Sequence, residues 1–308
     1  MDIEIAAAES LGVRGLSCMV NAGERHVLVD PGMALGYQRD GLLPHPVQVA
    51  AGEDARHRIL QLLPGATDIV ISHFHGDHVP LSGANPYQMS LKAAEPLMPK
   101  DARYWTAEFS AQNSKGDARY RDFCAAAGQE PLPSNVREDG GLSFSPPVPH
   151  GVPDSFMGTV MMTRMEDGHD VFVHASDIQL LADEPVSLIL DWAPTLLLVG
   201  GPPVYRGLSV NEAEMAWKRA RLLADHVEVC IMDHHLLRCE EGIEWLDGLN
   251  AASAGEVICA ADFMGRPRRF LEARRAELYA RYPVPEDWHE LYAQGLADTS
   301  AYRVPGLQ

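Results

Sequence analysis

Three histidines and one aspartate lie close together in a stretch whose side chains can bind metal ions. They are His73, His75, Asp77 and His78, and they follow the apolar run Thr67–Ser72 directly. A strand that ends in a tight turn can point alternate side chains into one pocket, so the first two histidines are expected to share one ion, while Asp77 and His78 face a second. Imidazole and carboxylate ligands favour Zn, Fe or Mn over Ca or Mg. A solvated polar loop explains a lone histidine well, but it does not explain four such residues at this density.

One loop supplies too few ligands for a metal centre, and further candidates occur at the ends of other predicted strands. His150 follows a proline-rich stretch, and Asp177 ends the apolar run Val171–Ser176. His234 and His235 end another apolar run. Each of these residues alone would more often cap an element or lie on the surface, but their shared placement at strand ends favours a ligand role. A carboxylate at Asp177 can bridge two cations with its two oxygens.

The elements that must position these residues begin with strands and continue with strands and helices. Strands are predicted at Arg14–Val20, Arg25–Val29, Thr67–Ser72, Leu142–Phe144, Thr159–Arg164, Val171–His174, Thr195–Val199 and Val227–Met232. Helices are predicted at Asp54–Leu63, Ala118–Ala127, Val210–Asp225, Gly242–Ala252 and Pro267–Tyr282. This order predicts stacked sheets with helices on their outer faces. No repeat or linker divides the chain, so we expect a single domain over residues 1–308 with an irregular insertion at about 80–133.

The composition is typical of a globular protein that binds neither nucleic acid nor membrane. Of the 308 residues, 46% are hydrophobic and 22% are charged, and the formal net charge is −18. Such an acidic surface repels phosphate backbones, which disfavours nucleic-acid processing. The longest apolar stretch, Val186–Val204, is interrupted by Asp191, glycines and prolines, so no membrane span is expected. The acidic start and five scattered cysteines without CxxC spacing predict reduced thiols and a cytoplasmic location.

The order of these motifs resembles the metallo-β-lactamase superfamily. An HxHxDH pattern is followed by a distant histidine, an aspartate after a small residue and a final histidine, and Val27–Gly32 matches the early strand-end aspartate of that superfamily at Asp30. Several stretches resemble one branch, the predicted metallo-hydrolases known chiefly from archaeal genomes, which have no settled substrate. They are residues 8–15, Pro44-His45-Pro46, residues 146–151, His174-Ala175-Ser176-Asp177, residues 200–205 and Asp233-His234-His235-Leu236-Leu237-Arg238.

The resemblance implies an α+β fold, a four-layer αββα sandwich of the metallo-β-lactamase type, with two divalent metal ions. Zn is the default for these ligands, and the same set holds Fe or Mn. The resemblance implies His73, His75 and His150 for the first ion, Asp77, His78 and His234 for the second, and Asp177 between them. His235 is the alternative to His234. Asp30 would accept a hydrogen bond and orient the loops that carry the ligands, or it is a plain turn aspartate before Pro31.

A dinuclear centre of this kind predicts a metal-dependent hydrolase. Two cations can share a water and supply a bridging hydroxide near neutral pH, and they stabilise the charge that develops on a carbonyl or phosphoryl oxygen. Asp77 or Asp177 would take or steer the proton. The expected substrate is a small molecule: an ester, lactone, amide, thioester or phosphodiester.

Residues that contact the substrate are harder to identify. Tyr205 and Arg206 follow an apolar strand in a Gly/Pro-rich loop, where they supply a donor, bind an anion, or form a structural turn. His174 donates a proton or packs beneath the metals. The segment Gln112–Lys115 lies in the insertion, where long loops often act as lids. Arg14 is expected to be a buried ion-pair partner. The last predicted helix is expected to have a solvent-exposed face of ion-paired side chains, formed by Arg268, Arg269, Glu272, Arg274, Arg275 and Glu277.

Two other functions compete with hydrolysis. One is a di-iron protein of the same fold that handles oxygen or electrons, although redox relatives carry a glutamate where His75 stands here. The other is a metal-bound sensor without turnover, which the presence of every expected ligand disfavours. The sequence leaves open whether the protein forms a homo-oligomer.

Overall fold

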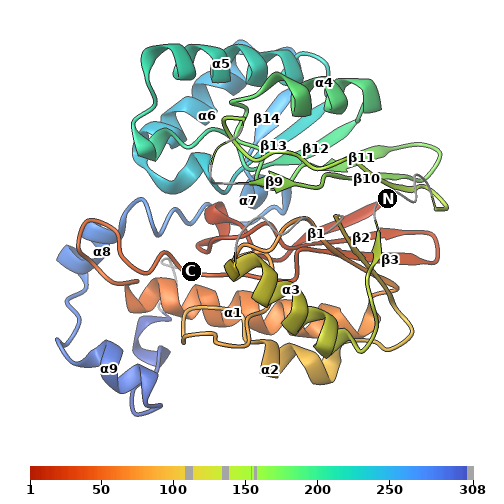
Figure 1. Ribbon diagram of the computed structural model, residues 1–308. Coiled ribbons are helices and arrows are strands. Elements are labelled where there is room, and N and C mark those ends of the chain that lie inside the picture. Colours follow the sequence, from red (N-terminus) through yellow and green to blue (C-terminus); the bar gives the residue numbers. More distant parts are fainter. Residues whose placement is uncertain (108–113, 134–138, 154, 156–157, 304–308) are drawn as a thin grey trace.

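The computed structural model describes residues 1–107, 114–133, 139–153, 155 and 158–303. These residues form two six-stranded sheets that lie face to face, with helices on the outer face of each sheet (Figure 1). A two-stranded ribbon pairs β8 (Val148–Pro149) with β9 (Thr159–Val160). The four-layer αββα sandwich expected from the sequence is therefore confirmed.

The first sheet is built in chain order. Its first three strands pair antiparallel, and the pairs from β3 to β6 are parallel. Helices α1, α2 and α3 cover its outer face, in the lower half of Figure 1. The elements are β1 (Asp2–Ile5), β2 (Cys18–Ala22), β3 (Arg25–Val29), α1 (Pro46–Leu62), β4 (Asp68–Ile71), α2 (Leu91–Ala94), β5 (Arg103–Thr106), α3 (Ser114–Ala127) and β6 (Leu132–Pro133).

The second sheet has the spatial order β14, β13, β12, β11, β10, β7. The pairs from β11 to β14 are parallel, and β10 pairs antiparallel with both β11 and β7. Helices α4, α5 and α6 cover this sheet, in the upper half of Figure 1. The elements are β7 (Leu142–Phe144), β10 (Thr163–Glu166), β11 (Val171–His174), α4 (Asp183–Trp192), β12 (Leu196–Val199), α5 (Val210–Ala224), β13 (Val229–Met232), α6 (Glu240–Ala252) and β14 (Glu256–Ile258).

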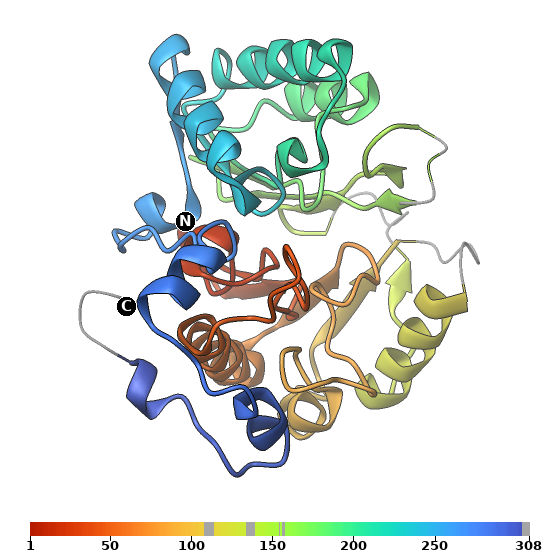
Figure 2. The ribbon, with the colours of Figure 1, turned by 90° about the vertical axis from the view of Figure 1, so that its left-hand side faces the viewer.

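The C-terminal part of the chain returns to the first sheet's helices. Figure 2 shows this segment, drawn in blue, running beside α1. It contains α7 (Ala260–Phe263), α8 (Arg275–Arg281), α9 (Trp288–Ala293) and the single turn η6 (Ser300–Tyr302). Other single 3-10 turns are η1 (Glu9–Leu11), η2 (Leu63–Gly65), η3 (Glu95–Leu97), η4 (Val204–Arg206) and η5 (Leu236–Arg238).

The layers follow from strands that are apolar on both faces. In β3, Val27 and Val29 pack in the core between the two sheets, whereas Leu28 packs in the core under the lower helices. In β12, Leu198 faces the first sheet and Leu197 faces the upper helices. Successive side chains of a strand point to opposite faces, so strands covered on both sides read as unbroken apolar runs.

Most predicted elements are confirmed, and α1 is longer than expected. The strands at Leu142–Phe144 and Val171–His174 have the predicted bounds. Helix α1 begins at Pro46 rather than Asp54, because the Nδ1 of His45 accepts the N–H of Val47 at 3.2 Å and caps the first turn. Proline is well tolerated in that first turn.

The predicted helix over 267–282 is wrong in its first half. Only α8 is helical there, because the preceding backbone is held by distant residues: the N–H of Arg269 donates to the carbonyl of Ser10 at 2.7 Å. The prediction that the charged residues of this segment face solvent is also wrong for two of them, since Glu272 and Arg275 are 0% and 1% exposed. Glu272 binds Arg14, which confirms Arg14 as a partly buried ion-pair partner.

The segment 80–133, expected to be an irregular insertion, contains regular elements in its described part. Strand β5 pairs with β4, β6 pairs with β5, and α2 and α3 pack on the same sheet. The described part therefore extends the first sheet. None of the helices in the described residues combines the length and apolarity needed to cross a bilayer. All five cysteines are free thiols.

Candidate metal centre

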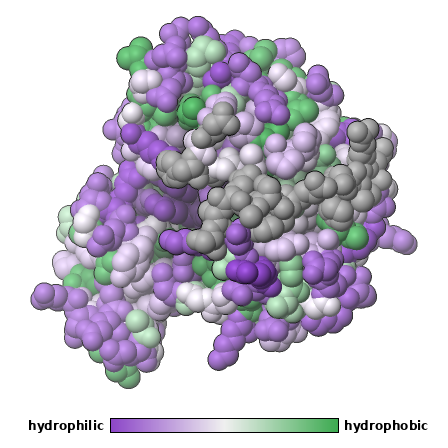
Figure 3. Space-filling model, viewed as in Figure 1, coloured by the Kyte–Doolittle hydropathy of each residue, from purple (hydrophilic) through white to green (hydrophobic). Residues whose placement is uncertain are grey.

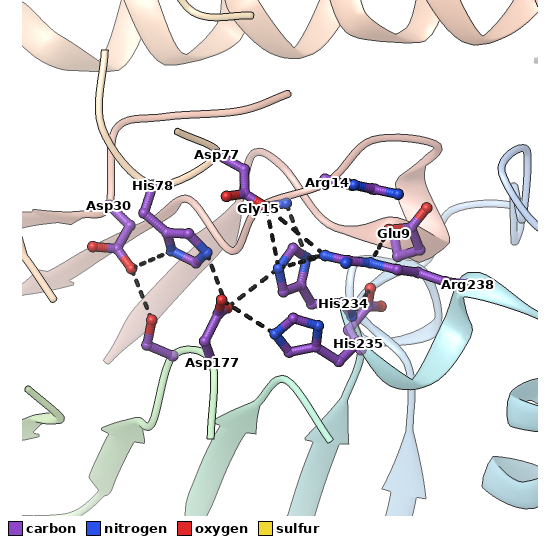
Figure 4. A network of polar contacts seen from close by, with 12 residues as sticks. Glu9, Arg14, Gly15, Asp30, Asp77, His78, Asp177, His234, His235 and Arg238 are labelled. Carbon is purple, nitrogen blue, oxygen red and sulfur yellow. Dashed lines mark hydrogen bonds and ion pairs between the residues drawn. The ribbon is translucent and has the colours of Figure 1, made fainter. Parts of the chain in front are cut away.

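The predicted ligands come from strand ends in both sheets. The loop after β4 carries the dense histidine motif, Asp177 follows β11, and His234 and His235 follow β13. His150 follows the short strand β8. The carboxyl ends of neighbouring parallel strands meet at one edge of a sheet, where α/β proteins commonly bind ligands. Figure 4 shows Asp177 surrounded by His78, His234 and His235 from these different loops.

Asp177 lies at the centre of the cluster and is 1% exposed. Its Oδ1 is 2.9 Å from the Nε2 of His78 and 3.2 Å from the Nε2 of His234. Its Oδ2 is within 3.5 Å of three other Nε2 atoms, those of His235 (3.2 Å), His150 (3.4 Å) and His73 (3.5 Å). One carboxylate therefore faces two groups of imidazoles, one group with each oxygen.

Among the described residues the potential ligand atoms form four groups, and two of them match the two sets that the family resemblance implies. The first group has its ligand atoms within 4.8 Å of one another and consists of His73, His75, His150 and Asp177. The second group meets the same limit and consists of Asp77, His78 and His234. The structure thus brings together every residue that the sequence predicted as a ligand, with His235 beside Asp177 and His234.

The polar atoms in the centre are better arranged for binding cations than for hydrogen bonding to one another. Within the described part of the chain, the Nε2 of His73 is buried without a hydrogen-bond partner, and the Nε2 of His78 faces the Oδ1 of Asp177 at 2.9 Å. Three carboxylates, those of Asp30, Asp77 and Asp177, lie among these rings. Buried charges and unpaired polar atoms are costly unless a counter-charge or ligand satisfies them. The residues therefore fit metal ions.

Most of the proposed ligands have the protonation state of a metal ligand. The exception is His78: burial acts to lower its pKa, but the carboxylates of Asp177 and Asp30 outweigh burial and raise the pKa well above the ordinary value. Burial, reinforced by the charge of His73, lowers the pKa of His75 to about 3. Burial likewise holds the pKa values of His150 and His235 well below the usual range. Burial acts to raise the pKa of Asp177, but the charges of neighbouring histidines outweigh it and the pKa is well below normal. Neutral imidazoles and ionised carboxylates are the forms that bind metals.

Asp30 orients the loop that carries the first ligands. Its Oδ2 accepts a hydrogen bond from Ser72 Oγ at 2.6 Å and lies 2.8 Å from the Nδ1 of His78. Its Oδ1 accepts the N–H of Ser72 at 2.8 Å, and Ser176 donates to Oδ2 at 3.0 Å. Partners of this kind fix the tautomer and the ring plane of a ligand histidine. The orienting position expected for Asp30 is the one observed.

Three residues beside the centre have a left-handed backbone. Asp30, Ser176 and His234 have φ angles of 49°, 50° and 45°. Each follows a strand that leads to the centre, β3, β11 and β13 respectively. A non-glycine residue in this region costs about 1–3 kcal/mol, and such residues cluster at functional sites. The turn that they make aims the adjoining side chains into the space between the sheets.

His234 and His235 both point at Asp177, but their surroundings differ. The N–H of Gly15 donates to the Nδ1 of His234 at 3.0 Å, and the Nε2 of that ring faces both the Oδ1 of Asp177 and the Nη2 of Arg238. Gly15 has a φ of 123°, and a Cβ on it would lie 2.7 Å from the carbonyl oxygen of Asp77. His235 has no partner on Nδ1 among the described residues, and its Nε2 lies 3.1 Å from the Nε2 of His150.

Arg238 is a site residue that the sequence analysis did not single out. Its side chain is 5% exposed, and its Nη2 lies 2.8 Å from the Nε2 of His234 and 3.8 Å from the Oδ2 of Asp77. Its Nη1 donates to the hydroxyl of Tyr205 at 3.2 Å. Its Nε donates to Glu9 at 3.3 Å (Figure 4). The only sequence signal was its position four residues after His234 in a turn that ends the histidine loop.

The predicted substrate contacts lie at different depths. Tyr205 is half-buried and Arg206 is exposed in η4. His174 is fully buried in β11, with its Nε2 2.8 Å from the carbonyl of Leu16, so it packs beneath the centre and offers no surface to a substrate. Lys115 is exposed at the start of α3. Gln112 and Asn113 lie outside the described residues.

Comparison with known proteins agrees with the geometry. The family model described as "Metallo-beta-lactamase superfamily" matches residues 12–227. A "UPF0282 protein" of Methanosarcina mazei is 46% identical over 303 residues, covering 98% of this chain and 99% of that protein. A "UPF0282 protein" of Thermococcus gammatolerans is 33% identical over 296 residues, covering 89% and 94%.

Solved structures show the same fold at low sequence identity. Tm1679, described as a metal-dependent hydrolase of the beta-lactamase superfamily, aligns with a TM-score of 0.51 at 15% identity, over 83% of this chain and 94% of that one. The metallo-beta-lactamase fold protein YhfI from Bacillus subtilis aligns with a TM-score of 0.50 at 11% identity, over 83% and 95%. With the strand-end histidines, the central position of Asp177 and the archaeal relatives taken together, the chain belongs to the metallo-beta-lactamase superfamily.

Proposed function

We propose that the protein is a hydrolase that uses two divalent metal ions to cleave a small-molecule substrate. The proposal rests mainly on Asp177, because its two carboxylate oxygens face two separate groups of imidazoles. A carboxylate in this position holds two cations next to each other. Such a pair lowers the pKa of a shared water and stabilises negative charge on a carbonyl or phosphoryl oxygen.

The two groups divide the ligands between them. The first ion would be held by His73, His75 and His150 with Asp177 Oδ2, and the second by Asp77, His78 and His234 with Asp177 Oδ1. We add His235 to the first ion, because its Nε2 lies 3.1 Å and 3.2 Å from two of that ion's ligand atoms. Separations of this size are usual between atoms that are each about 2.0–2.2 Å from one metal. Zn is the expected metal, and Fe or Mn suits the same ligands.

Asp77 is better placed than Asp177 to move a proton. The side chain of Asp77 is 19% exposed, whereas that of Asp177 is 2% exposed and Asp30 is fully buried. Of these three carboxylates, Asp77 is therefore the one that a substrate can reach. We assign proton transfer to Asp77, in addition to its place among the ligands of the second ion, and metal holding alone to Asp177.

The expected bonds are those of esters, lactones, amides, thioesters and phosphodiesters in small molecules. Nucleic acids are disfavoured as substrates because the net charge of −18 opposes binding of a long phosphate backbone. A cytoplasmic location stays a prediction.

Metal analysis with a spectrum tests the proposal. Elemental analysis of protein purified without added metal should find about two Zn or Mn per chain without visible absorbance, and the protein should hydrolyse at least one member of an ester, lactone, thioester and phosphodiester panel. Asp177→Asn should lose both metal and turnover, whereas Asp183→Asn on the surface should keep both. Two Fe with redox-sensitive absorbance, or no metal after reconstitution, would overturn the proposal.

The last two histidines can be separated in the same way. His235→Gln should reduce the metal content at the first ion, and His234→Gln at the second, each from about two to about one per chain. If either variant keeps the full metal content, that histidine is not a ligand.

A further inference from the structure

Arg238 places a positive charge beside the second set of ligands. Its Nη2 lies 2.8 Å from the Nε2 of His234 and 3.8 Å from the Oδ2 of Asp77 (Figure 4). In the first set, neither His73 nor His150 makes a hydrogen bond or ion pair with an arginine of the described residues. The two sets of ligands therefore differ in the charge that lies next to them.

The guanidinium of Arg238 does not take the place of an ion on His234. Its Nη2 is also 3.3 Å from the Nδ1 of the same ring. An atom in line with the Nε2 lone pair would be much farther from Nδ1 than from Nε2, so this guanidinium lies over the ring and Nε2 can still face a cation. An ion and the guanidinium can therefore be bound at the same time.

The charge of Arg238 must nevertheless act on an ion that His234 binds. A metal such as Zn lies about 2.0–2.1 Å from a ligating histidine nitrogen. Because Nη2 is 2.8 Å from that same nitrogen, the ion and Nη2 would be no more than about 5 Å apart, whatever the direction of the ion. Like charges at this separation repel each other, and the repulsion grows as the surroundings become less polar.

Arg238 is also held in this position from its other side. Its Nη1 donates to the hydroxyl of Tyr205 at 3.2 Å, and its Nε donates to Glu9 at 3.3 Å. The molecule has a strongly hydrophilic hollow between its upper and lower halves (Figure 3), but the side chain of Arg238 is only 5% exposed. Water therefore does little to screen the charge.

The carboxylates in contact with Arg238 do not remove the effect of its charge. Burial, together with the charge of Glu272, raises the pKa of Glu9 to about 8, which leaves Glu9 largely protonated at neutral pH. Asp77 is ionised, but it is a proposed ligand of the second ion. That ion must therefore share Asp77 with Arg238.

We infer that the two metal positions have unequal affinities, because Arg238 repels the ion of the second set and shares Asp77 with it. The first set binds its ion more tightly, so the centre fills in a fixed order and holds two ions only when enough metal is supplied. This inference rests on the proposed dinuclear hydrolase, but the affinities can be measured without turnover.

Titration of the whole chain, stripped of metal, with Zn²⁺ in competition with a coloured chelator tests the inference. The unchanged protein should bind Zn²⁺ in two steps of different affinity, and His234→Gln should lose the weaker step. Arg238→Gln should tighten the weaker step at least about tenfold, since a divalent ion and a unit charge about 5 Å apart repel by this much even in bulk water.

Two further variants separate the charge from other effects. Arg238→Lys keeps the positive charge and should leave the weaker step as it is in the unchanged protein. The matched control is Arg221→Gln, which removes an arginine of α5 that pairs with Asp225 on the surface, and both steps should be unchanged. General loosening of the fold would weaken metal binding, so a tighter step in Arg238→Gln has no such explanation.

The inference is overturned if the unchanged protein binds both ions equally, if His234→Gln loses the tighter step, or if Arg238→Gln fails to tighten the weaker step at an unchanged melting temperature. A looser step in Arg238→Gln would mean that Arg238 orients Asp77 for the ion. The hydrolase proposal fails separately. Two unequal steps without reaction on any panel substrate would keep the inference and reject the hydrolase, whereas turnover with two equal steps would reject the inference alone.

Discussion

Histidines gather in two regions of this molecule, and the partners of their ring nitrogens differ between the two regions. Beside α1, a histidine–tyrosine cluster consists of His45, Tyr87, Tyr279, His289 and Tyr292. In it, the Nδ1 of His289 lies 2.8 Å from the Tyr87 hydroxyl, and its Nε2 lies 2.9 Å from the Tyr279 hydroxyl. His45 is likewise bonded at both nitrogens, to Val47 and to the carbonyl of Tyr282. In the centre, the Nε2 of His73 has no hydrogen-bond partner within the described part of the chain, and the Nε2 of His78 faces the Oδ1 of Asp177 at 2.9 Å.

The difference separates histidines that hold the fold from histidines that hold a ligand. Both nitrogens of His45 and His289 are bonded to protein and leave no lone pair for a metal. The buried, unpaired Nε2 of His73 instead needs a partner from outside the chain. Residue type alone does not distinguish them, since Pro44-His45-Pro46 looked as much like a family motif as the metal ligands did.

The largest expected effect comes from changing one carboxylate in each region. Asp77→Asn should lower kcat by about 100- to 10,000-fold on any substrate found, because it removes a carboxylate that is both the proposed proton acceptor and a proposed ligand of the second ion. Glu53→Gln is the matched change beside the histidine–tyrosine cluster, where Glu53 accepts hydrogen bonds from Tyr292 and Thr299. Steady-state kinetics should show normal kcat for this variant, with a lower melting temperature. Equal losses of kcat in both variants would show that the two regions do not differ in function.

A smaller effect is expected from residues behind the ligands. Asp30→Asn should weaken metal binding about ten- to a hundredfold, since it disturbs the hydrogen bond that orients His78. Asp68→Asn is a good control because Asp68 is equally buried in the same sheet but binds Arg103 and Trp105. Competition with a coloured chelator measures both affinities. A matching loss in the control would mean that general loosening of the sheet, rather than ligand orientation, sets the affinity.

The pH dependence of stability should come partly from the histidine–tyrosine cluster. Burial lowers the pKa values of His45 and His289 below the ordinary value of 6.5. A histidine with a lowered pKa contributes stability that is present above the unfolded pKa and is lost as the pH falls below it. The free energy of unfolding in urea should therefore fall from pH 7 towards pH 5, and the double variant His45→Gln/His289→Gln should show a smaller fall. An unchanged slope would exclude these two groups.

The smallest expected effect is the loss of one hydroxyl. Tyr279→Phe removes the hydrogen bond to the Nε2 of His289 and should destabilise the protein by about 1 kcal/mol, with no change in metal content. Chemical denaturation and elemental analysis check the two halves of this statement. Metal loss in this variant would show that the two regions are coupled.

The parts of the site that follow directly from one strand were predictable from the sequence. The loop after β4 places four candidate ligands in a single turn, and the apolar run before it predicts the strand end at which they begin. The strands Leu142–Phe144 and Val171–His174 were predictable for the same reason, since an apolar run with polar flanks has few other structures available.

The parts that depend on distant contacts were not predictable. Arg238 contacts Glu9 across 229 positions of sequence, and Arg14 meets Glu272 across 258, so no local pattern reports either pair. The helix expected over 267–282 failed for this reason, because buried ion pairs overrode its favourable spacing. The different roles of His234 and His235 depend on a left-handed backbone angle that periodicity does not reveal.

The left-handed turns at Asp30, Ser176 and His234 have a consequence for metal binding. Their strain is borne by the folded chain itself, supported by the surrounding sheets, and it does not depend on a cation to induce it. A loop that is already shaped loses little further entropy when an ion arrives. An ion should therefore bind without a prior rearrangement of these loops, and the preshaped ligands should hold it more tightly than loops that had to order on binding.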